Sequence, residues 1–103
     1  METIRTAKEI KKMTSKVKEI LNNEKNYQIF KDSISKAYEI TKSTKLHSVL
    51  IFYISIFNTF EVEEAYFREY FEASKWLNSK VEEKSGNVQY YSCILDGEIK
   101  ARS

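Results

Sequence analysis

Apolar residues recur at α-helical spacing in two stretches of the first half of the chain. In the first stretch they fall at Ala7, Ile10, Met13, Val17, Ile20 and Leu21. Thr6 and Glu9 form a capping box ahead of that stripe. In the second stretch they fall at Tyr27, Phe30, Ile34, Ala37, Tyr38 and Thr41. The spacing predicts helices over residues 7–21 and 26–42, with Asn26 as the second N-cap and each helix laying one face on another element.

Residues 47–57 are apolar almost without interruption. Val49, Ile51 and Ile54 are β-branched, and Phe52 and Tyr53 are aromatic, which favours a strand. Polar residues do not alternate with them, so we expect both faces of this strand to be covered. A buried helix is the alternative, because periodicity does not separate the two for a short apolar run.

The next stretch, residues 59–79, carries apolar residues at steps of three and four. They are Val62, Tyr66, Tyr70, Ala73 and Leu77, and Phe67, Phe71 and Trp76 broaden the stripe. Thr59 is suited to the N-cap, and the acids that follow it suit the first turn of a helix. We therefore predict a third helix here, with more aromatic rings than one face needs for a small core.

The C-terminal part has strand and turn signals. Residues 88–95 predict a strand, and Asp96-Gly97 predicts a tight hairpin into the residues after it. Residues 81–83 are expected to form a short strand. The resulting order, α-α-β-α-β-β, predicts an α+β fold with helices packed on a small, mainly antiparallel sheet, as a single domain over residues 1–103.

The composition excludes most kinds of catalytic site. The chain has one cysteine, one histidine and two glycines, which excludes a disulfide framework, most metal clusters and glycine-rich phosphate loops. Cys93 and His47 are the one available Cys–His pair, but Cys93 lies in an apolar strand where an inert thiol is usual. Glu98 and Lys100 have the acid-x-lysine form of some metal-dependent nucleases, with Asp96 nearby. Three such pairs occur, close to chance for this content of acids and lysines.

We therefore expect no enzyme activity, no catalytic residue, no metal and no cofactor. The remaining candidates are surfaces that bind macromolecules. The distribution of charge and the distribution of aromatic residues indicate where such surfaces lie.

Charge is unevenly distributed, although the formal net charge is only +2. Residues 1–45 hold ten lysines and one arginine against six acids, whereas the rest of the chain is acidic. Lysines on the first helix could follow a phosphate backbone without reading sequence. The residues of this alternative, a non-specific nucleic-acid site, are Lys8, Lys11, Lys12 and Lys16.

The aromatic residues of 59–79 favour protein–protein association, with self-association into a homo-oligomer as one form of it. The candidate protein-binding residues are Tyr66, Phe67, Tyr70, Phe71 and Trp76. Glutamates surround these rings and suit a basic partner; they are Glu61, Glu63, Glu64, Glu69 and Glu72. The competing interpretation is that the rings fill the core and that the acids form a solvated helix face.

Two segments resemble parts of small phage-encoded accessory proteins. They are the capped basic start, Thr6-Ala7-Lys8-Glu9-Ile10, and the tyrosine-rich strand, Val88-Gln89-Tyr90-Tyr91-Ser92. The resemblance implies a viral or mobile-element accessory protein that binds or blocks a host factor, and it assigns no catalytic residue. The N-terminus shows no apolar signal core, and the longest apolar run is too short to span a bilayer. We therefore expect a cytoplasmic protein with no membrane partner and a reduced Cys93.

Overall fold

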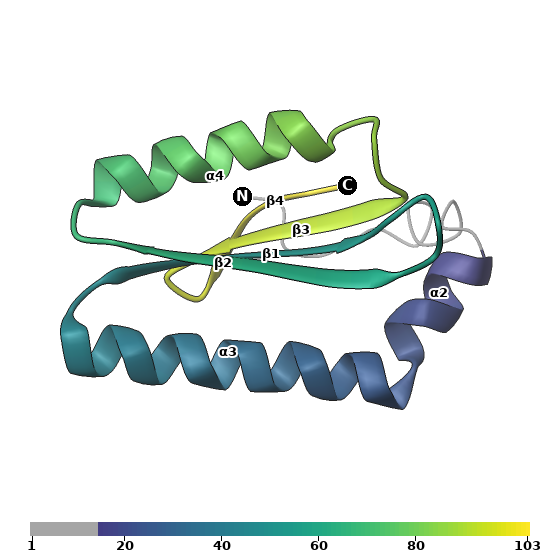
Figure 1. Cartoon of the computed structure of the whole chain (residues 1–103), viewed down its shortest axis with the longest axis horizontal. Coiled ribbons are helices and arrows are strands. Elements are labelled where there is room, and N and C mark those ends of the chain that lie inside the picture. Colours follow the sequence, from purple (N-terminus) through teal and green to yellow (C-terminus); the bar gives the residue numbers. More distant parts are fainter. Residues whose placement is uncertain (1–14) are drawn as a thin grey trace.

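A computed structural model describes residues 15–103 as one antiparallel sheet between two helices (Figure 1). The elements are α2 (Ser15–Asn22), α3 (Glu24–Thr44), β1 (His47–Ile54), β2 (Phe60–Phe67), α4 (Tyr70–Lys84), β3 (Tyr90–Leu95) and β4 (Glu98–Arg102). The strand order is β2-β1-β3-β4, with α3 on one face of the sheet and α4 on the other. The α+β class with a mainly antiparallel sheet is confirmed. The expected order of elements recurs with one more strand, β2, between β1 and α4.

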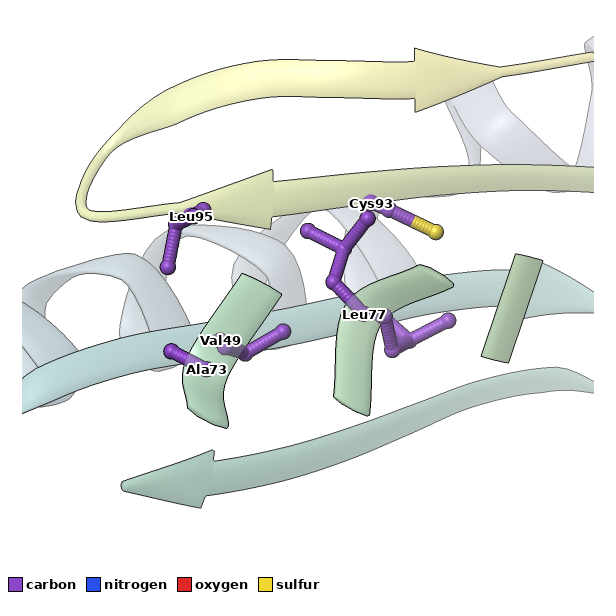
Figure 2. Close-up of a cluster of buried hydrophobic side chains, with 6 residues drawn as sticks. Val49, Ala73, Leu77, Cys93 and Leu95 are labelled. Atoms are coloured by element: carbon purple, nitrogen blue, oxygen red, sulfur yellow. The ribbon is translucent and has the colours of Figure 1, made fainter. Parts of the chain in front are cut away.

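β1 is the strand expected in residues 47–57, so the alternative of a buried helix is wrong. It lies between β2 and β3, and its side chains alternate between two cores. Val49 and Ile51 pack toward α4, whereas Leu50 and Phe52 pack toward α3. Figure 2 shows the first of these cores, where Cys93 faces the side of the sheet covered by α4. A strand covered on both faces needs apolar residues at every position, which explains the lack of polar alternation.

The helix expected over residues 59–79 is wrong in its first part. Residues 60–67 form β2, which pairs with the whole of β1, and the helix begins only at Tyr70. Phe60 and Val62 alternate with glutamates and pack toward α3, as a strand requires. The same residues also fitted a helical spacing, and pairing with β1 decided between the two. The short strand expected at 81–83 is also wrong, because α4 continues to Lys84.

The ends of the elements depend on a few polar residues. Asn23, and not Asn26, caps α3, because its Oδ1 accepts hydrogen bonds from the N–H groups of Lys25 and Asn26 at 3.0 and 3.2 Å. The Asp96-Gly97 hairpin is confirmed. Its two residues have φ values of 50° and 85°, the positive values that a tight two-residue hairpin turn needs.

The helix expected over residues 7–21 falls mostly outside the described residues, as does its capping box. Its C-terminal end corresponds to α2, which ends at Asn22. Within residues 15–103 no helix combines the length and the apolar character needed to cross a membrane.

Candidate functional site

A shallow hollow lies between α4 and the last residue of β2. It has a volume of about 350 Å³, and its lining residues are Phe67, Phe71, Glu72, Lys75, Trp76 and Ser79. The Phe67 and Trp76 rings lie 5.9 Å apart and form the half-buried floor. Phe71 stands at the rim with 74% of its surface exposed. Three of the five predicted protein-binding residues therefore line one concave surface, which we call the aromatic hollow.

The other two predicted binding residues lie elsewhere. Tyr66 neighbours Phe67 on β2 but points to the opposite face of the sheet, where it packs toward α3. Burial raises the pKa of its phenol, and the Glu64 carboxylate adds to this effect. Tyr70 is half exposed and lies edge-on to His47, with ring centroids 5.5 Å apart. The expectation that all five rings share one helix is wrong, because Tyr66 and Phe67 belong to a strand.

Glu63 joins β2 to α4 through two lysines. Its carboxylate lies 2.8 Å from the Lys80 ammonium and 2.7 Å from the Lys84 ammonium. Lys84 is 6% exposed, contacts Glu83 at 3.0 Å and lies 3.8 Å from the centroid of the Tyr53 ring. We call these four charged residues, Glu63, Lys80, Glu83 and Lys84, the ion-pair network.

Hydrogen bonds within the network shift the pKa values of Lys84 and Glu63. Burial alone would lower the pKa of Lys84, but the hydrogen bonds to Glu63 and Glu83 outweigh it and raise that pKa. Burial alone would raise the pKa of Glu63, but the hydrogen bonds from the two lysines outweigh it and lower that pKa. The raised pKa favours the charged form of Lys84, which suits a structural ion pair better than a nucleophile. Lys80 also lies 5.0 Å from the Trp76 ring centroid, so the network helps to position the floor of the aromatic hollow.

The acids around the rings separate into two groups. Glu63 is used within the network, and Glu64 pairs with Lys36 of α3 at 2.8 Å. Glu61, Glu69 and Glu72 are exposed and form no ion pair with any residue of 15–103. The surface around β2 and the start of α4 therefore keeps an excess of negative charge.

The Cys–His pair weighed from the sequence is not a catalytic pair. The His47 Nδ1 lies 2.7 Å from Asp96 Oδ2, so the partner of His47 is a carboxylate. Cys93 lies opposite Ile51, four residues further along β1, or about 13 Å at strand spacing. Cys93 is fully buried, and burial raises the pKa of its thiol to about 11.

The acid and the lysine of the acid-x-lysine pair on β4 form an ion pair with each other. The Lys100 ammonium lies 2.9 Å from the Glu98 carboxylate, and Asp96 is occupied by His47 and by the backbone N–H of Ser48. Among residues 15–103 no group of three or more histidines, cysteines and acids is placed to hold a metal ion.

The nucleic-acid alternative falls largely outside the described residues. Lys8, Lys11 and Lys12 precede residue 15, and Lys16 is exposed on α2 with Glu19 at 3.6 Å. A non-specific nucleic-acid site on this helix therefore stays a prediction.

The tip of the β1–β2 hairpin is an exposed apolar feature that sequence reasoning missed. Ile56 and Phe57 were expected in a strand, but they lie in a turn and are 65% and 79% exposed. Asn58 adopts a φ of 67°, and the Ser55 hydroxyl accepts hydrogen bonds from the N–H groups of Phe57 and Thr59. Asn58-Thr59 was the available turn signal.

A second, more enclosed pocket lies between α3 and the sheet, beside the β3–β4 turn. Its volume is about 260 Å³, and Ile34, Leu50 and Ile94 give it a mainly apolar lining.

Comparisons of the chain with protein-family models, with curated proteins and with solved structures found no match.

Proposed function

We propose that this protein acts by binding another protein through the aromatic hollow, and that it is not an enzyme. The observation that carries the proposal is the convergence of Phe67, Phe71 and Trp76, from two elements, on one concave surface. A ring that is 74% exposed at the rim of an aromatic floor is the kind of anchor that is enriched at protein interfaces. The exposed acids Glu61 and Glu72 favour a basic partner.

The resemblance to phage accessory proteins gives the proposal its biological form. A small viral or mobile-element protein in the cytoplasm of its host would use this surface to occupy a host factor and inhibit it. Self-association through the same surface is the other form, and the two differ in what is recovered from a binding experiment.

The experiment compares two exposed phenylalanines at different places on the protein. Tagged wild-type protein, Phe71→Ser and Phe57→Ser are used as baits in a bacterial lysate, and captured proteins are identified by mass spectrometry. We expect one stoichiometric protein with the wild type and with Phe57→Ser, and its loss with Phe71→Ser. Phe57, at 79% exposure, is the matched control because it lies on the hairpin tip, away from the aromatic hollow.

Equal capture by all three baits would refute binding at the aromatic hollow. Recovery of nucleic acid alone would replace the proposal by the alternative that uses Lys16 and the lysines before it. Circular dichroism of each bait confirms that the exposed substitutions leave the fold intact.

A further inference from the structure

Within residues 15–103, the outer edge of the sheet at β2 has unpaired backbone groups. In this part of the chain β2 pairs with β1 alone, and their register places Tyr53 opposite Glu61 and Ile51 opposite Glu63. Towards β3, β1 uses its even-numbered residues, because the carbonyls of Ser48 and Ile54 accept hydrogen bonds from Asp96 and Gln89. Odd-numbered residues of β1 therefore bond to β2, since backbone groups alternate in direction along a strand.

The same alternation fixes which groups of β2 are free. Glu61, Glu63, Ala65 and Phe67 bond to β1. The N–H and C=O groups of the other four residues point away from the sheet; these residues are Phe60, Val62, Glu64 and Tyr66. No other strand within residues 15–103 pairs with them. Such a row of donors and acceptors is a template for one more strand.

A second copy of this protein is a poor match for that edge. The two longest in-register overlaps of β2 paired antiparallel with itself, centred on Glu63 and on Glu64, place a glutamate of one copy directly opposite a glutamate of the other, and the register centred on Ala65, which avoids this, overlaps over residues 63–67 alone. Like charges directly opposite one another destabilise a strand pair. Of the five glutamates in residues 60–72, Glu63 and Glu64 already pair with lysines of this protein, which leaves Glu61, Glu69 and Glu72 against one arginine, so the complementary strand is basic.

From these observations we propose that an extended, basic segment of a partner protein adds to the sheet as a strand beside β2. The inference rests on the proposed function and names how the partner binds. The added segment places one large apolar side chain beside Phe67, in the aromatic hollow, and two cationic side chains, one beside Glu61 and one beside Glu64, whose carboxylate it shares with Lys36. Because these three positions are three residues apart, the partner carries an apolar residue and lysine or arginine three and six positions away, in either strand direction.

The test uses a short threonine-rich peptide with one leucine and with lysines three and six positions after it. Fluorescence of Trp76, the single tryptophan, reports binding because its ring forms the floor of the hollow. In the antiparallel register the first lysine lies opposite Glu64 and points its N–H at β2, whereas the N–H of the second points away. N-methylation of the first lysine should weaken binding about tenfold or more, and N-methylation of the second less than about twofold.

The matched protein variants are Glu64→Pro and Glu64→Ala. Both remove the carboxylate, but only proline removes an N–H from the free edge, and it leaves the bonds to β1 intact. We expect Glu64→Pro to lose most peptide binding relative to Glu64→Ala. In amide hydrogen exchange of the wild type, Phe60, Val62, Glu64 and Tyr66 should exchange quickly without peptide and become protected with it.

Several results would overturn strand addition. They are no Trp76 response at millimolar peptide, equal effects of the two N-methyl groups, and unchanged exchange at the four amides. Protection that appears with rising protein concentration alone would identify a second copy as the occupant and would also overturn it. If Phe71→Ser abolishes partner capture while Glu64→Pro does not, the proposed function stands and strand addition fails.

Discussion

Replacing Glu63 by glutamine tests whether the ion-pair network holds α4 on the sheet. The substitution keeps the size of the side chain and removes the charge shared by Lys80 and Lys84. The side chain of Lys84 is only 7% exposed. In the variant its ammonium group loses the 2.7 Å contact with the Glu63 carboxylate, and it gains no water in exchange. The nearby Tyr53 ring and Glu83 remain as partial compensation.

The magnitude follows from burial. Removing one partner of a fully buried ion pair costs about 3–5 kcal/mol. Glu63 is 28% exposed, and Lys84 keeps Glu83 at 3.0 Å, so we expect a loss of about 2 kcal/mol in the free energy of unfolding. For a domain of this size that loss lowers the Tm by roughly 10 °C. Lys84→Met should lower the free energy of unfolding by less, about 1 kcal/mol, because it removes the buried ammonium group itself and so leaves no buried charge without a partner.

The pH dependence gives an independent check. The two lysines hold the pKa of Glu63 below its ordinary value in the folded state. A carboxyl with a lowered folded pKa stabilises the protein above its unfolded pKa of about 4.3, and this contribution is lost as pH falls through the folded pKa. The deficit of Glu63→Gln should therefore be largest at neutral pH and shrink in acid.

Urea unfolding followed by circular dichroism, at neutral and at acid pH, measures both effects. Glu82→Gln is the matched control, because Glu82 is an exposed glutamate of α4 that forms no ion pair within residues 15–103. A Glu63→Gln deficit no larger than that of Glu82→Gln would refute the reasoning. A deficit that stays constant on acidification would refute the assignment to the Glu63 charge. Adding Lys84→Met to Glu63→Gln should recover part of the loss.

Three further predictions concern single residues. Cys93, fully buried and with a thiol pKa of about 11, should react with a thiol reagent only at the rate of unfolding, and fast labelling of the native protein would contradict this. Gly97→Ala should lower the free energy of unfolding by about 1 kcal/mol in chemical denaturation, because the φ of Gly97 is +85°. Gly86→Ala should cost a similar amount, because the φ of Gly86 is +79° although the space around it is open. Unchanged stability of both variants would show that the strain argument fails. Asn23→Ala should cost about 1 kcal/mol because two N–H groups of α3 lose their acceptor, whereas Asn22→Ala, which removes no such cap, is the control whose equal loss would contradict the assignment.

Much of the fold was accessible from local patterns. The helix over α3, the strand over β1 and the Asp96-Gly97 turn each have a signal within a few residues: helical spacing, a β-branched and aromatic run, and a residue pair that tolerates positive φ. The aromatic hollow was partly accessible as well. The sequence predicted Phe67, Phe71 and Trp76 as binding residues, and they line one hollow, although that hollow needs a strand beside a helix and not one continuous helix.

The amino-acid sequence by itself determined the α+β class, the position of α3, the Asp96-Gly97 turn and the small number of cysteine, histidine and glycine residues, because these depend on residue type and short-range spacing. Only the tertiary structure decided that residues 60–67 form a strand, that Tyr66 and Phe67 face opposite ways, and that Glu63 pairs with Lys80 and Lys84. The physical reason is the pairing with β1: an ambiguous apolar pattern becomes a strand when a neighbouring edge offers hydrogen bonds along its whole length. That pairing also created the free edge and the aromatic hollow, on which the function proposed for this protein depends.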